Sequence, residues 1–323
     1  MKEYSDLGIP GHEIHKLQNL EFYAGIAPDL SGKDLSGKNL DRADLGHANL
    51  SNANLSGAYM HGAILTNADL RGANLLGANL DLSAIDGALI DERTQMDAKW
   101  HLVWKLVNHK MQTHDLSGLD LRYVRLIDMD LSGANLSGTD LTGSMLIKVN
   151  FQNANMCGAI LTDLQDLTDE ITLHGVIVDD KTVMGERERL IWEIVNVGVA
   201  GRQLSGVNLF SMNLKEADFR RANLSGADLR GCILEGADFS GADLRQAKLR
   251  VAQLQKANFD NADLRGANLL GAALQGANLE HAQLDESTDF YKAQYDEVTR
   301  WPNNVDPAVR VANRELWEKR RKK

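Results

Sequence analysis

A large aliphatic residue recurs at every fifth position over long stretches of this 323-residue chain. In residues 43–80, an alanine stands two positions before nearly every such residue, with Asp or Asn between them. Residues two apart in an extended segment point to the same side, so the alanine and the leucine face one way and the polar residue faces the other. The two remaining residues must turn the chain, and glycine is frequent there, as in Ser56-Gly57. The period therefore predicts short extended sides joined by corners and wound around an interior of leucine and alanine.

The pattern A-(D/N)-L-x-x resembles the pentapeptide-repeat family. This resemblance implies an all-β solenoid, namely a right-handed quadrilateral β-helix with four repeats per coil. Repeat centres run from Leu30 to Ile90, from Leu116 to Leu161 and from Leu204 to Leu284. These blocks hold about forty repeats and predict about ten coils.

The two interruptions between the blocks are copies of one another. A shift of 88 residues places Trp104 on Trp192 and Asn108 on Asn196. Apolar residues three or four apart predict a short helix in each interruption. We expect a helical N-terminal cap at 1–26, one repeat solenoid at 27–284 with excursions at 91–113 and 179–203, and a C-terminal cap with a helix and a basic tail at 285–323. Caps are expected because an open coil end exposes strand edges.

A shorter signature, hydrophobic-D-(D/E)-x-T, opens both excursions and occurs twice more near the C-terminus. Its first acidic residues are Asp91, Asp179, Asp285 and Asp296. Two adjacent carboxylates followed by a hydroxyl could bind a cation. We favour the alternative that Asp and Thr hydrogen-bond nearby backbone where the chain leaves the coil.

No pattern in the sequence is typical of catalysis. There is no phosphate loop of the G-x-x-x-x-G-K type, and the nine histidines lack metal-ligand spacing. Side chains on an evenly spaced convex surface do not converge in a pocket, which most catalysis requires. We therefore expect a protein that is not an enzyme and has no catalytic residues, no metal ligands and no cofactor.

Partner contact is expected at four arginines and two tryptophans. If four repeats close a coil, the arginines stack in two pairs on adjacent coils, where they could bind an anionic partner surface. The favoured alternative is that an aspartate two residues before most of them neutralises the charge. The tryptophans either anchor a partner or pack their helices onto the coils, and packing is favoured. The candidates are Arg230, Arg245, Arg250, Arg265, Trp104 and Trp192.

These observations predict a protein–protein interaction scaffold or regulatory adaptor that presents a rigid surface to an unidentified protein partner. The segment 291–317 could also support a homodimer. No apolar run reaches the roughly 18 residues that span a bilayer, and the N-terminus lacks an apolar signal-peptide core, so we expect a cytoplasmic protein without a transmembrane segment.

The alternative is a DNA mimic. Some pentapeptide-repeat proteins resemble duplex DNA in width and charge and inhibit DNA gyrase, and the net charge of this chain is −10. The charge distribution argues against this alternative, because the longest block, 204–284, carries nine acidic and nine basic residues. A DNA mimic needs dense negative charge along one side. Binding of nucleic acid is also not expected.

Overall fold

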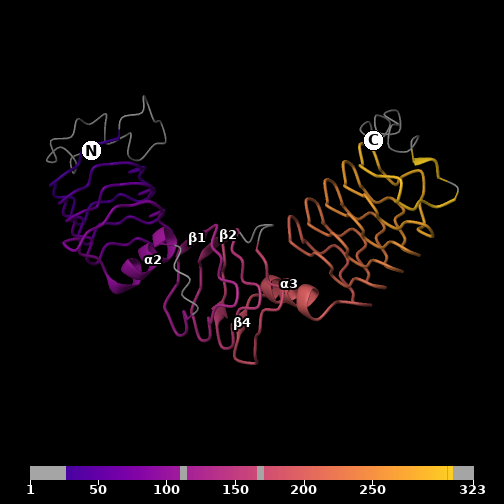
Figure 1. The fold of residues 1–323 in the computed structure, drawn as a ribbon, viewed down its shortest axis with the longest axis horizontal. Helices are drawn as coiled ribbons and strands as arrows, with labels where there is room; N and C mark the ends of the chain where they lie inside the picture. Colours follow the sequence, from indigo (N-terminus) through magenta and orange to yellow (C-terminus); the bar gives the residue numbers. More distant parts are fainter. Residues whose placement is uncertain (1–26, 110–114, 166–170, 304, 308–323) are drawn as a thin grey trace. The chain divides into compact units, whose positions relative to one another are not determined.

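The computed structural model describes residues 27–109, 115–165, 171–303 and 305–307 (Figure 1). These residues form two compact units. The first unit contains the described residues of 27–149, 155–165 and 178–183, and the second contains those of 150–154, 171–177 and 184–307. In both units the chain forms a stack of similar short segments (Figure 1).

The backbone of each unit pairs in parallel with the segment twenty residues further along. Asn49 pairs with both Asp29 and Asp69 in the first unit, and Asp243 pairs with both Asn223 and Asp263 in the second. Each bridge is a pair of ordinary hydrogen bonds, for example from Asn223 N to Arg202 O at 2.8 Å. An offset of twenty residues corresponds to four repeats, as the family resemblance implies.

The interior is built from the alanine and leucine positions of the repeat. Leu45, Ala48 and Leu50 are fully buried, and the same holds along the later blocks. Burial of one leucine side chain contributes roughly 1.5–3 kcal/mol, so the repeated pattern itself supplies the driving force for folding. In the second unit Phe219, Phe239 and Phe259 take the leucine position in successive coils and stack with ring centroids 5.0 and 5.1 Å apart.

The corners follow from backbone conformation. The second corner residue has a positive φ, as at Asn52 (57°) and Gly57 (62°). Asparagine and glycine tolerate this left-handed region better than other residues, which is why they are common at this position of the repeat.

Each interruption between repeat blocks contains one helix, as expected. Helix α2 spans Ala98–His109 and helix α3 spans Glu186–Asn196 (Figure 1). Longer runs of strand occur only around the second block of the described chain, where the bounds are β1 Arg125–Ile127, β2 Met145–Ile147, β3 Ile160–Leu161 and β4 Val183–Met184. β1 pairs in parallel with β2, again at an offset of twenty residues, and β3 pairs with β4.

The pairing continues past Leu284, where the sequence analysis ended the repeats. Asp289 and Gln294 pair with residues twenty-one positions earlier, and Arg300 pairs with Asn278, twenty-two positions earlier. The offset grows because each signature, at Asp285 and at Asp296, adds one residue to a coil. The expected N-terminal cap at 1–26 and the basic tail lie outside the described residues. Neither α2 nor α3 is long and apolar enough to cross a membrane, and the described chain contains no other helix that could.

Candidate functional site

Helix α2 lies over the preceding coil and bonds to its backbone through two side chains. The indole N–H of Trp104 donates to the carbonyl of Ala88 at 2.6 Å. The side-chain amide of Asn108 donates to the carbonyl of Ile85 at 3.1 Å, and its oxygen accepts the N–H of Gly87. In a regular coil the equivalents of the Gly87 N–H and the Ala88 carbonyl bond to the next coil, so the helix supplies the partners that one side of that coil would supply. The Ile85 carbonyl also accepts the N–H of Ala88 within its own turn.

Helix α3 repeats this arrangement in the second unit. The indole N–H of Trp192 donates to the carbonyl of Val176 at 2.8 Å. The Asn196 amide donates to the carbonyl of Leu173 at 3.0 Å and accepts the N–H of Gly175 at 2.7 Å. Every partner lies 88 residues after its counterpart in the first unit.

Both tryptophans are half-buried and hydrogen-bonded to their own units. A partner-anchoring role for them stays a prediction. No role was predicted for the two asparagines, although each of them hydrogen-bonds to three backbone groups. The available signal was their fixed position, four residues after the tryptophan in both copies.

The D-(D/E)-x-T signature bonds to backbone, the alternative that the sequence favoured. The Asp91 carboxylate accepts the N–H of Gly72 at 2.9 Å, and the Thr94 hydroxyl donates to the carbonyl of Leu70 at 3.0 Å. The other three signatures make the equivalent bonds, through Asp179 and Thr182, Asp285 and Thr288, and Asp296 and Thr299. The Arg93 guanidinium, which also bonds Asp91, lowers the pKa of that carboxyl to about 2.

No group of three or more potential metal ligands gathers anywhere in the described chain. In each signature one oxygen of the first carboxylate accepts backbone N–H groups of the protein itself.

Three of the four candidate arginines are neutralised by the aspartate two residues before them. In each pair the arginine Nε donates to one carboxylate oxygen and Nη2 donates to the other, at 2.6–2.9 Å. The pairs are Arg230–Asp228, Arg245–Asp243 and Arg265–Asp263. This double hydrogen bond holds the pKa of each of these carboxyls below its ordinary value. The same pairing at Arg71, Arg122 and Arg220 shows that it is a property of the repeat.

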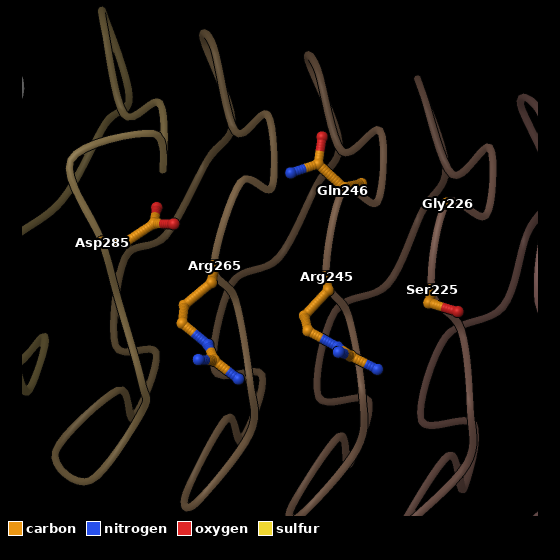
Figure 2. Close-up of a pocket in the computed structure, with 6 residues that line it drawn as sticks. All are labelled: Ser225, Gly226, Arg245, Gln246, Arg265 and Asp285. Atoms are coloured by element: carbon orange, nitrogen blue, oxygen red, sulfur yellow. The ribbon is translucent and has the colours of Figure 1, made fainter.

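Two of these arginines line a shallow depression of about 590 Å³ in the second unit. Figure 2 shows the side chains of Arg245 and Arg265 extending side by side from neighbouring coils, with Ser225 and Gly226 on one flank and Asp285 on the other. The depression exists because the flanking corners carry small side chains. Its arginines are already paired, so it offers no free cation for an anionic ligand.

Arg250 is the exception among the four arginines. It is exposed, and it forms no ion pair with a described residue. Residue 248, two positions before it, is lysine in place of aspartate. The structure therefore divides the candidate arginines into three neutralised members and one whose charge is available.

A family model described as pentapeptide repeats matches the chain in eight copies, within 27–88, 114–163, 203–250 and 252–288. No curated protein matches the chain significantly.

Several solved structures are similar. One is HetL of the cyanobacterium Nostoc sp. strain PCC 7120, described as involved in heterocyst differentiation regulation, with 24% identity, 86% coverage of both chains and a TM-score of 0.26. Another is a pentapeptide repeat protein of the Arabidopsis thaliana thylakoid lumen, with 27% identity over 38% of this chain and 88% of that one and a TM-score of 0.19. QnrB1, a plasmid-mediated fluoroquinolone resistance protein, is 14% identical over 81% of this chain and 88% of its own, with a TM-score of 0.16.

At such low TM-scores and identities, classification rests on the repeats themselves. The repeat model covers more than half of the chain. The matched segments contain the buried alanine and leucine positions and the backbone pairing at an offset of twenty residues. The chain therefore belongs to the pentapeptide-repeat family.

Proposed function

We propose that this protein is a non-catalytic protein–protein interaction scaffold or regulatory adaptor. The observation that carries the proposal is the use of its polar side chains. Signature carboxylates, helix asparagines and most repeat arginines bond to the protein itself, and no described cluster has the composition of a metal site. A surface of this kind suits recognition by shape and by a few available charges better than chemical transformation.

The proposal includes a right-handed quadrilateral β-helix of about ten coils as the rigid display surface. It also includes caps at 1–26 and 285–323, a cytoplasmic location and a homodimer formed through 291–317. Deletion of 291–317 tests the last point. A full-length dimer that becomes a monomer supports an interface, whereas aggregation identifies the segment as a cap.

Affinity capture with the full-length chain from cells of its source organism, followed by mass spectrometry, tests the scaffold function. The matched bait carries serine at Arg230, Arg245, Arg250 and Arg265. We expect a reproducible partner that the wild-type bait retains and the variant loses, with similar thermal stability of both baits. Retention by both baits rejects the arginines as the contact, and the absence of any reproducible partner rejects the scaffold function.

The alternative function is a DNA mimic that inhibits an enzyme such as gyrase. The net charge of −10 favours it. The neutralised Asp–Arg pairs oppose it, because they remove the continuous negative charge that a mimic of the phosphate backbone needs. A gyrase supercoiling assay decides between the two, and we expect no inhibition at micromolar concentrations of this protein.

A further inference from the structure

One side of the coils in the second unit differs in charge from the other three. It consists of the repeats 207–211, 227–231, 247–251 and 267–271, here called the Arg250 face. Its backbone pairing runs from Asn208 through Asp228 and Lys248 to Asn268. The face has three bases and one acid, a net charge of +2. The opposite face, 217–221, 237–241, 257–261 and 277–281, has two bases and four acids, a net charge of −2.

The exposed apolar side chains of these coils are also found on the Arg250 face. Within 202–281, all of which the structure describes, the exposed large hydrophobic residues are Phe210 (47%) and Val251 (57%). Half-buried Leu270 lies in the same column as Phe210, three coils further along. The outward column immediately after the leucine position therefore reads Phe210, Arg230, Arg250, Leu270, with cations between two apolar ends.

The positive charge at the centre of the face is available to a partner. Neither Lys248 nor Arg250 forms an ion pair with a described residue. Arg230 is bonded to Asp228, and its guanidinium lies 5.3 Å from the centre of the Phe210 ring. The bond from Arg230 lowers the pKa of the neighbouring Asp228 carboxyl, and the charge of Lys248 helps to lower it. Three cations therefore share one carboxylate, and an acidic partner would relieve the repulsion among them.

Val251 adds local strain at the same place. Its φ is +58°, in the left-handed region, and glycine holds the equivalent corner in the coils before and after it, at Gly231 and Gly271. A β-branched residue there costs roughly 1–2 kcal/mol relative to its ordinary conformation. With 57% of its surface exposed, Val251 recovers little of this cost by packing within its own unit.

The spacing of the column selects the shape of the partner. Successive coils in this unit are separated by about the distance of the stacked phenylalanine rings, 5.0–5.1 Å. Side chains on one side of an extended strand repeat about every 6.6–6.8 Å. This repeat is longer than the separation of the coils, so an extended partner could not place one side chain on each successive coil. The pitch of an α-helix is about 5.4 Å, so a helix laid along the column presents one side chain to each coil.

We propose that the Arg250 face binds an acidic amphipathic α-helix of a partner protein. The helix lies along the column and directs its two carboxylates at the coils of Arg230 and Arg250, where Lys248 adds to the positive charge. It places its apolar side chains on Phe210 at one end and on Leu270, next to Val251, at the other. This proposal rests on the scaffold function and identifies the chemistry of the partner that the scaffold recognises.

A synthetic helical peptide of about 18 residues tests the proposal directly. Its four contact residues are Leu, Glu, Glu and Leu, spaced one helical turn apart, and all other positions are alanine or glutamine. Because this order is symmetric, the peptide can bind with either direction of its helix along the column. Binding to the full-length chain is measured by fluorescence anisotropy. We expect saturable binding, and at least about tenfold weaker binding by Arg250→Glu. A second peptide with Lys in place of both Glu should bind the Lys248→Glu, Arg250→Glu double variant better than it binds wild type.

Arg221→Glu is the matched control, because Arg221 is an exposed arginine without an ion pair to a described residue and lies on the opposite face. Its affinity for the acidic peptide should equal that of wild type. Val251→Gly should bind the peptide more weakly while its melting temperature stays the same or rises. That variant separates loss of the contact from loss of the fold.

The outcomes separate this proposal from the scaffold function. No binding of the acidic peptide by wild type, or equal losses in Arg250→Glu and Arg221→Glu, overturns the Arg250 face. If affinity capture still recovers a partner through other residues, the scaffold function stands without this face. If capture recovers none, the scaffold function fails independently of the peptide result.

Discussion

Helices α2 and α3 are the two regions that can be compared residue by residue. Shifted by 88 residues, they share the tryptophan and the asparagine that bond to backbone, together with Leu102/Leu190 and Val107/Val195. Their first turns differ fully. α2 opens with Ala-Lys-Trp-His, whereas α3 opens with Glu-Arg-Glu-Arg. The comparison teaches that bonding to the covered coil determines only part of each helix. The first turn varies even where it is buried, as at Trp100, whose counterpart is Glu188.

The two modules also connect differently to the coils around them. In the first unit, Lys99 of α2 donates to the carbonyl of Arg122 at 2.6 Å, and Arg125 pairs with Asp86. In the second unit, Glu193 of α3 pairs with Arg202. The shared backbone contacts should therefore have equal energetic effects in the two units, whereas the connections should not.

Replacing the helix asparagine should have the largest effect. Asn108→Leu and Asn196→Leu each leave one glycine N–H of the covered coil without a partner and remove the second hydrogen bond of the Ile85 or Leu173 carbonyl, so we expect a loss of about 1–3 kcal/mol in local stability. Hydrogen exchange at the amides of Gly87 and Gly175 measures this loss in each unit separately. The aspartate variants keep the acceptor and should protect these amides better than the leucine variants. If the loss of local stability differs strongly between the two units, helices α2 and α3 do not play equivalent roles.

Removing the indole N–H should have a smaller effect. Trp104→Phe leaves the Ala88 carbonyl unpaired, and Trp192→Phe does the same to Val176, so we expect about 1–2 kcal/mol in each case. Urea unfolding followed by the remaining tryptophan fluorescence measures it. If either variant keeps its stability but loses a captured partner, the tryptophan is an anchor and the packing interpretation is wrong for that module.

The smallest expected effect is the dependence of the melting temperature on pH through Asp91 and Asp179. Asp91 has a pKa of about 2, lowered mainly by Arg93, whereas the pKa of Asp179 is lowered first by the backbone N–H of Gly158. A carboxyl with a lowered folded-state pKa stabilises the protein fully above its ordinary pKa of 3.8, and this contribution is lost as pH falls toward 2. Asp91→Asn and Asp179→Asn should therefore lower the melting temperature at pH 7 and approach wild type near pH 2.

Salt distinguishes the two carboxylates. The bond between Asp91 and Arg93 joins the half-buried carboxylate to an exposed guanidinium, so molar salt should reduce the effect of Asp91→Asn more than that of Asp179→Asn. Equal salt dependence would contradict the assigned causes of the two pKa shifts.

Most of the repeat structure could be predicted from the sequence, because two positions in five, the alanine and the leucine, are buried in coil after coil. Leu45 and Leu50 are examples, and the signature at Asp91 was also interpreted correctly. The role of Asn108 could not be predicted, because it depends on which backbone groups the helix leaves unpaired. The pairing beyond Leu284 was missed for a similar reason. One added residue at Asp285 breaks the period of five in the sequence but not the hydrogen bonding between coils.

Of the candidate site, the neutralisation of Arg230, Arg245 and Arg265 was predictable from an aspartate two positions earlier. The separate status of Arg250 was equally visible in Lys248. The exposure of Phe210 and Val251 also follows from their corner positions after a leucine, but the sequence did not show that the Phe210 ring lies against the Arg230 guanidinium.

In a chain with a period of five, one inserted residue would shift the register, so that every later leucine would face outward. The Asp–Thr signature restores the register. Its carboxylate takes the place of a backbone carbonyl, so a coil accepts an extra residue and the following repeats return to the correct side. Helices α2 and α3 each begin four residues after the threonine of such a signature, at Ala98 and Glu186. New segments can therefore be added to this architecture after a signature without changing the repeats that follow. Grafts made after Phe290 or Trp301, which correspond to Met96 ahead of helix α2, should be tolerated for the same reason.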